Sequence, residues 1–125
     1  AVNSARSFMY STALPACVIA ASIAALKLIE NNPRIIDQLW TNRDKAAQGI
    51  LAAGYDIMGS ESPIIPIRTG SVENTLRIAK HLFEQGILAP AIRPPTVKEP
   101  RIRITVTAAH TDQDIVRLIE ALKGM

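Results

Sequence analysis

The first strong pattern is an apolar run with few interruptions, from Pro15 to Glu30. Proline is tolerated in the first turn of a helix, and the run has the length of a helix. Apolar residues surround this predicted helix on every side. Because a helix of that kind must be covered on all sides, the pattern predicts that a further domain or a partner subunit covers it.

Three later segments show the one-sided periodicity of amphipathic helices. The first follows Asn32-Pro33 and ends before Gly54, and the second is capped by Ser71 and ends at Gly86. The third opens with a capping box in Thr111–Asp114 that uses Asp in place of Glu. The side chains expected to face the core are Ile35, Ile36, Leu39, Trp40, Ala47, Ile50 and Leu51 on the first, Val72, Leu76, Ala79 and Phe83 on the second, and Ile115, Leu118, Ile119 and Leu122 on the third.

Three segments read as strands. Ile64–Arg68 is short and apolar, and its central Pro66 cannot donate to a ladder, which indicates an edge or a bulge. Ile87–Ile92 is a second candidate, broken at Pro90 and followed by a stiff turn. Arg101–Thr107 has the clearest alternation, because side chains point to opposite faces along a strand. Ile102, Ile104 and Val106 point one way, and Arg101, Arg103, Thr105 and Thr107 point the other.

The order of these elements predicts an α+β fold: a small, mainly antiparallel sheet with helices on one face. The helices should meet the isoleucine face of the last strand. The face that carries the arginines is then left for something else, and guanidinium groups suit carboxylates and phosphates.

Composition excludes several classes of function. The 125 residues are 48% apolar and 20% charged, which is typical of a globular domain. The net charge of +3 is not concentrated in a basic run, and only five residues are aromatic, so nucleic-acid binding has no support. The apolar run is interrupted by Ser22 and Lys27 and is too short for a membrane span.

The lone cysteine, Cys17, cannot form an internal disulfide, and we expect it to be a small buried hydrophobe, in keeping with a reducing cytoplasm. His81 and His110 stand far apart, so no metal site is expected. His110 precedes the last helix and is expected to serve its capping turn.

Four residues are candidates for binding an anion. Arg93 and Arg103 could each hold a carboxylate or phosphate, although exposed arginines on a turn or sheet are the simpler alternative. Ser11 and Thr12 are adjacent hydroxyls ahead of the proline-started helix, where a phosphate could accept hydrogen bonds. A plain turn into the helix is the alternative for this pair.

Three segments carry a resemblance to a known family. Ser7–Pro15, Ala91–Val97 and Arg101–His110 resemble, in the same order, segments of the α-oxoamine synthases, which are pyridoxal-phosphate-dependent enzymes. The Arg93–Val97 turn is most similar to the biotin-pathway branch, which condenses L-alanine with a pimeloyl thioester and releases carbon dioxide. A second branch, which joins glycine to acetyl coenzyme A, is the alternative. The loop before Arg101 is shorter than is usual in the family.

The resemblance implies roles for the four candidates. Ser11, with Thr12 beside it, matches a hydroxyl residue that reaches the phosphate of pyridoxal 5'-phosphate in the neighbouring subunit of a homodimer. Arg103 matches the arginine that holds the amino-acid carboxylate. Arg93 matches an arginine near the active-site entrance. The implied partners are therefore an amino acid, an acyl thioester and a second subunit, with no metal.

The resemblance also implies a division of the chain. Residues 1–32 would link from a cofactor domain, and residues 33–125 would form the C-terminal domain of a fold-type I pyridoxal-phosphate enzyme. None of the five lysines stands in the family's Thr-x-x-Lys context, so we expect the cofactor lysine upstream of Ala1, no catalytic residue in this chain, and no activity of the chain alone. A free-standing, dimeric α+β binding module is the alternative from a different class.

Overall fold

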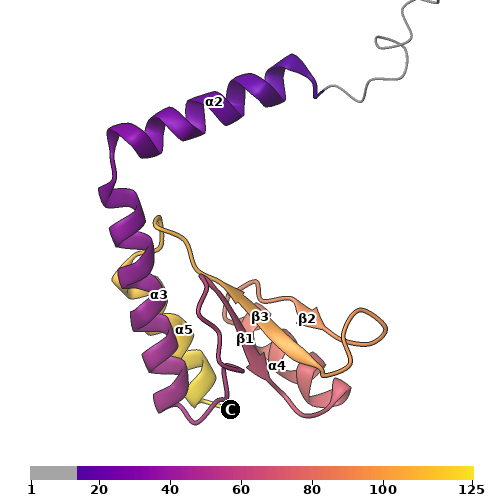
Figure 1. The fold of residues 1–125 in the computed structure, drawn as a ribbon. Coiled ribbons are helices and arrows are strands. Elements are labelled where there is room, and N and C mark those ends of the chain that lie inside the picture. The colour runs from indigo at the N-terminus through magenta and orange to yellow at the C-terminus, as the bar shows by residue number, and fades with distance from the viewer. Residues whose placement is uncertain (1–13) are drawn as a thin grey trace, which may run out of the picture. The chain divides into compact units, whose positions relative to one another are not determined.

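The computed structural model describes residues 14–125 (Figure 1). It divides into two compact units, one ending at Pro33 and the other spanning Arg34–Met125. The first contains helix α2 (Ala16–Asn31). The second contains, in order, α3 (Arg34–Ala52), β1 (Ile64–Arg68), α4 (Val72–Glu84), β2 (Ala91–Ile92), β3 (Arg101–Thr105) and α5 (Asp112–Lys123).

Helix α2 confirms the first predicted helix, with Pro15 directly before its first residue. None of its residues is buried, and Leu26 and Leu28 are both more than 60% exposed. The expectation that Cys17 is buried was wrong, because its side chain is exposed. A residue on an all-apolar helix is buried only where another element packs on it. Across residues 14–125, no helix is long and apolar enough to cross a membrane.

The three strands form one antiparallel sheet in the order β1-β3-β2, with β3 in the middle (Figure 1). The register sets Ile65 opposite Ile104 and Ile67 opposite Ile102. All four side chains are buried, and the alternation in β3 predicted this for Ile102 and Ile104. The α+β class is therefore confirmed, with the isoleucine face of the sheet in the core.

The helices supply the other half of that core. Helix α4 contacts β2, β3 and α5, and α5 in turn contacts α3. The predicted core stripe of α5 is confirmed at Ile115, Leu118 and Leu122. Burying a side chain of this size contributes about 1.5–3 kcal/mol, so the stripe accounts for the attachment of the last helix.

The predicted core stripe of α4 was wrong at three of its four positions, because only Ala79 packs against the core. Phe83 is 68% exposed and Leu76 is 48% exposed. The buried residues are Thr75, Ile78 and Leu82. Both faces of this helix carry apolar residues at helical spacing. The buried face includes the polar Thr75, so hydropathy favoured the other face. The hydroxyl of Thr75 can be buried because it lies within hydrogen-bonding distance of Thr69 Oγ1 (2.6 Å) and Ser71 O (2.7 Å).

The second predicted strand is much shorter than expected. Only Ala91 and Ile92 pair with β3, and residues 87–90 lie outside the sheet. Two features end the ladder. Pro90 has no N–H to donate, and the N–H of Ile87 donates to Leu82 O (2.8 Å), which keeps this segment at the end of α4.

The predicted caps are confirmed. Ser71 accepts a hydrogen bond from Asn74 N, and Thr111 and Asp114 form a complete capping box. His110 serves the turn between β3 and α5, as expected, because its Nδ1 accepts a hydrogen bond from Thr107 N (3.0 Å).

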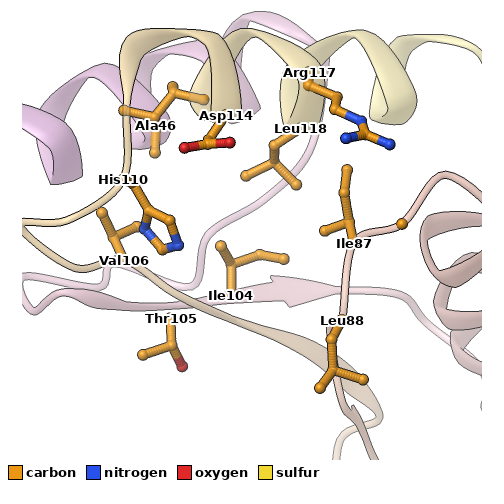
Figure 2. A pocket seen from close by; sticks show the side chains of 12 residues that line it. Ala46, Ile87, Leu88, Ile104, Thr105, Val106, His110, Asp114, Arg117 and Leu118 are labelled. Atoms are coloured by element: carbon orange, nitrogen blue, oxygen red, sulfur yellow. The ribbon is translucent and has the colours of Figure 1, made fainter.

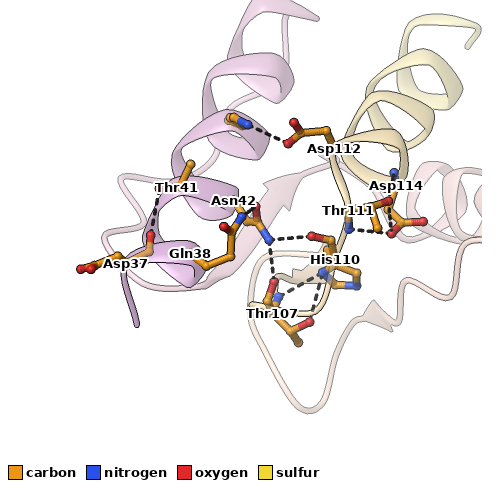
Figure 3. A network of polar contacts seen from close by, with 10 residues as sticks. Asp37, Gln38, Thr41, Asn42, Thr107, His110, Thr111, Asp112 and Asp114 are labelled. Atoms are coloured by element: carbon orange, nitrogen blue, oxygen red, sulfur yellow. Dashed lines mark hydrogen bonds and ion pairs between the residues drawn. The ribbon is translucent and has the colours of Figure 1, made fainter. Parts of the chain in front are cut away.

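A buried asparagine on α3 holds that turn in place (Figure 3). Asn42 is fully buried, and its Nδ2 donates to Thr107 O (3.0 Å) and to His110 O (2.8 Å). Its Oδ1 accepts from Gln38 Nε2 (2.8 Å). The residue thus joins α3 to the end of β3 and the start of α5. Asn42 stands at core spacing with Ala46 and Ile50, but a polar side chain at such a position gives no local signal that it is buried.

We predict that Asn42→Ala lowers the free energy of unfolding by about 2 kcal/mol, because the partly buried carbonyls of Thr107 and His110 lose their donor. Asn42→Asp, which keeps the shape but loses both donors, should also destabilise the chain. The matched control is Gln48→Ala, an exposed site on the same helix. Urea unfolding followed by circular dichroism measures the difference. Equal stability of N42A and Q48A would contradict the role given to Asn42.

Candidate functional site

The candidate site lies on the face of the sheet that the helices do not cover. We call it the open face, and it consists of the side chains that alternate with the buried isoleucines: Ile64, Pro66, Arg68, Ile92, Arg101, Arg103 and Thr105. The register sets Arg68 directly opposite Arg101, and Pro66 opposite Arg103. Three guanidinium groups therefore share one small surface.

Arg68 is committed to two carboxylates. Its Nε donates to Asp56 Oδ2 (2.8 Å), and its second ion pair is with Glu99. The hydrogen bond with Asp56 raises the pKa of Arg68, with Glu99 adding to the effect. The pKa of Asp56 is lowered, mainly because Met58 N–H donates to it and also because Arg68 lies beside it. The sequence analysis did not identify this triad, whose members are far apart in the chain.

Arg101 and Arg103 differ in what surrounds them. Arg101 is half-buried, faces Arg68, and donates from Nε to Glu99 O (3.3 Å). Arg103 is exposed and faces the uncharged Pro66. Within residues 14–125, its guanidinium makes no hydrogen bond or ion pair. Of the arginines in β3, Arg103 is thus the one whose planar fork is available to an incoming carboxylate.

Arg93 lies in the turn that follows β2. Thr96 N donates to Arg93 O (3.1 Å), which closes the predicted turn, and the Pro94–Pro95 peptide bond is cis. The residues of this turn line an open depression of about 300 Å³, and Arg93 is exposed at its edge. Arg103 does not line this depression. The structure therefore gives the two predicted arginines different surroundings.

The remaining candidates fall into two groups. Ser11 and Thr12 lie outside the described residues, so their predicted role stays a prediction. All five lysines are exposed, and two of them pair with carboxylates: Lys45 with Asp112 (2.7 Å) and Lys80 with Glu84 (3.8 Å). No group of three or more metal-binding side chains occurs between residues 14 and 125.

Comparison with known proteins identifies the family. The model of the aminotransferase class I and II family matches residues 1–122, and this chain belongs to that family. Within it, the chain resembles the α-oxoamine synthases. It is 42% identical over 118 residues to an 8-amino-7-oxononanoate synthase of Citrifermentans bemidjiense, which covers 91% of this chain and 30% of the relative. It is 40% identical over 131 residues to that of Geobacter metallireducens, covering 98% and 34%.

Solved structures agree on the fold. The crystal structure of 8-amino-7-oxononanoate synthase from Francisella tularensis matches with a TM-score of 0.78 and 25% identity, over 98% of this chain and 36% of that one. A serine palmitoyltransferase of Sphingomonas wittichii matches with a TM-score of 0.83 and 21% identity, over 98% and 32%. Another serine palmitoyltransferase structure, with a TM-score of 0.85 and 20% identity, contains pyridoxal phosphate.

These matches have a common extent. The chain spans about a third of the length of the curated relatives it matches. Its fold is that of the C-terminal domain of fold-type I pyridoxal-phosphate enzymes, which confirms the predicted fold class. The family resemblance stated from the three sequence segments is confirmed as well.

The Arg68 triad gives a prediction for the pKa of Asp56. Arg68→Gln should raise the pKa of Asp56 toward its usual value of 3.8, but not fully, because the Met58 N–H remains. A lowered folded pKa contributes stability that is present above the unfolded pKa and is lost as the pH falls through the folded value. Carboxyl carbon NMR during an acid titration measures the pKa of Asp56. Urea unfolding at several pH values measures the stability. An Asp56 pKa that is the same in both proteins would show that Arg68 does not act on it. Arg77→Gln on α4 is the control.

Proposed function

We propose that this chain supplies the C-terminal domain of a pyridoxal-phosphate-dependent acyltransferase. This enzyme condenses L-alanine with a pimeloyl thioester, with loss of carbon dioxide, in biotin biosynthesis. The names of relatives 40–42% identical over nearly the whole chain support this reaction. In the structure, the proposal rests on one observation. Arg103 is exposed on the open face and has no partner among residues 14–125.

Arg103 is proposed to hold the carboxylate of the amino acid. A guanidinium can bind a carboxylate through two parallel hydrogen bonds, which fixes the orientation of the amino acid as well as its position. The neighbouring Arg101 is held by Glu99 O and faces Arg68, so it is less suited to this role. Arg93, at the edge of its own depression, is proposed to lie at the substrate entrance.

The proposed cofactor is pyridoxal 5'-phosphate, which when bound supplies an electron sink for the carbanion at the α-carbon of the amino acid. The enzyme is proposed to be a cytoplasmic homodimer. Ser11 and Thr12 of one subunit are proposed to donate hydrogen bonds to the phosphate of the cofactor that the other subunit holds. The donors on the open face fit this chemistry, because the guanidinium of Arg103 has no partner within residues 14–125 and can bind an amino-acid carboxylate. Residues 1–32 are proposed to link this domain to the cofactor domain.

The chain is proposed to lack activity by itself. None of the five lysines stands in the family's Thr-x-x-Lys context, and all five are exposed. We predict no oxononanoate formation by the purified 125-residue chain with pyridoxal phosphate, L-alanine and pimeloyl coenzyme A. Product above the level of a protein-free control, detected by mass spectrometry, would overturn this proposal.

The function itself is tested by exchanging domains. The last third of the Geobacter metallireducens enzyme is replaced by this chain, and the chimera is expressed in bacteria that lack the synthase. Growth without biotin, and condensation of L-alanine with the pimeloyl thioester by the purified protein, is the expected result. A chimera that folds and prefers glycine with acetyl coenzyme A would instead favour the other branch. A folded chimera that does neither would favour a binding module.

In that chimera, Arg103→Ala should raise the KM for L-alanine by about 10- to 100-fold, because a charge-assisted pair is lost. Arg103→Lys should recover part of the loss, since it restores the charge but not the planar fork. The control is Arg77→Ala on α4, whose guanidinium bonds only to Asn74 Oδ1 within residues 14–125. Steady-state kinetics with alanine as the varied substrate measures all three. An unchanged KM in R103A with a raised KM in R101A would reassign the role.

A further inference from the structure

A second site lies on the helix-covered side of the sheet. At this point residues 87–89 do not form ladder hydrogen bonds with β3. The N–H of Arg103 donates to Pro90 O (3.0 Å) on the β2 edge, and the N–H of Val106 donates to Pro63 O (2.9 Å) on the β1 edge. Because backbone groups alternate between the two edges of a strand, Thr105 directs its N–H and C=O to the β2 edge. Within residues 14–125, no backbone group bonds to Thr105 there.

Thr105 is paired with Ile64 on its other edge, and a pocket of about 290 Å³ lies beside the edge that faces β2 (Figure 2). Its apolar wall is formed by side chains from three elements, including Ile104, Val106 and Leu118. Leu88 is on the rim and is 83% exposed. In a continuous ladder Leu88 would pair with Thr105, as the register of Ala91 with Ile102 implies. The pocket lies where Leu88 would pair with Thr105 in such a ladder.

The polar rim of the pocket adds a further donor. The Nδ1 of His110 accepts from Thr107 N (3.0 Å), so the neutral ring carries its proton on Nε2. Asp114 and Arg117 lie on the same rim (Figure 2). The site thus combines a backbone donor and acceptor, one ring donor and an apolar wall. A few convergent polar groups on an apolar cavity are typical of small-molecule sites.

We propose that this pocket binds a small N-acyl amino-acid amide. One residue of the ligand would exchange two hydrogen bonds with Thr105, as in an antiparallel pair. Neighbouring groups along an extended chain point to opposite faces. The acyl group that flanks the paired residue therefore points to the helix-covered face and enters the apolar pocket beside Ile104 and Val106.

The site is one residue long, which sets the size of the ligand. Arg103 N is bonded to Pro90 O on one side of Thr105, and Thr107 N is bonded to His110 Nδ1 on the other. A longer extended peptide would gain no further backbone hydrogen bond at this edge. The geometry therefore favours a small amide over a peptide strand.

The probe that tests this is N-isovalerylglycine N-methylamide, titrated into the full 125-residue chain and followed by amide and methyl NMR shifts. We expect saturable shifts at Thr105 and Leu118 with a Kd on the order of a few millimolar, as the size of the probe allows. N-acetylglycine N-methylamide, which lacks the branched group, should bind at least about fivefold more weakly, since about three methylenes of burial are lost. The ester analogue, in which oxygen replaces the glycine N–H, should also bind more weakly.

Two variants locate the binding. Thr105→Pro removes the backbone donor and should abolish the shifts, whereas Thr105→Val keeps the backbone and the branched shape and should bind as the original chain does. If Thr105→Pro does not fold, the comparison of amide with ester decides the question. Equal binding of amide and ester, or shifts that do not include Thr105, would overturn the proposal. A tetrapeptide that binds more than tenfold more tightly than the probe would also overturn it, in favour of a peptide partner.

Discussion

The alternation of side chains along β3 is the constraint on which the rest of the structure depends. β3 is the central strand of the sheet, and its alternate residues Ile102 and Ile104, followed by Val106 just beyond the strand, are buried. A slip of one residue would move Ile102 and Ile104 to solvent and bring Arg101 and Arg103 into the core. Burying unpaired guanidinium groups is strongly unfavourable, whereas burying the aliphatic side chains that they would displace is favourable. The core therefore fixes the orientation of the arginines.

The same constraint sorts the arginines by partner. Arg68 and Arg101 face one another across the sheet, and like charges in that position repel. Asp56 and Glu99 offset this by pairing with Arg68. Arg103 needs no such pairing because it faces Pro66, which carries no charge. The surface thus contains one arginine paired with carboxylates, one bonded to a backbone carbonyl, and one that is open to an anion. The packing of the core therefore determines which arginine is available for the chemistry proposed on the open face.

Much of this arrangement was predictable from local patterns. The period of two in β3, the proline-started α2 and the capping box of α5 each carry their signal within a few adjacent residues, and each was confirmed. The failures have a different cause. The buried face of α4 contains Thr75, whose burial depends on hydroxyl partners at Thr69 and Ser71, and hydropathy alone favours the opposite face.

The candidate site shows the same division between local and tertiary information. The sequence could single out Arg103, because the alternation and the family resemblance both point to it. It could not find the Arg68 triad, whose three members meet only through folding, or Asn42, whose two backbone acceptors are more than 60 residues away. The shortening of β2 likewise depends on a bond from Ile87 back to α4, and within residues 14–125 it leaves Thr105 paired with Ile64 of β1 but with no partner on the β2 edge.

The central claim is that the alternation in β3 leaves Arg103 available for the carboxylate of the substrate. The most direct measurement is a crystal structure of the domain-exchange chimera with pyridoxal phosphate and L-alanine. We expect both nitrogens of the Arg103 fork to lie about 2.7–2.9 Å from the alanine carboxylate oxygens, with Arg68 still paired to Asp56. A carboxylate held by Arg101 or Arg93, with Arg103 in solvent, would contradict it.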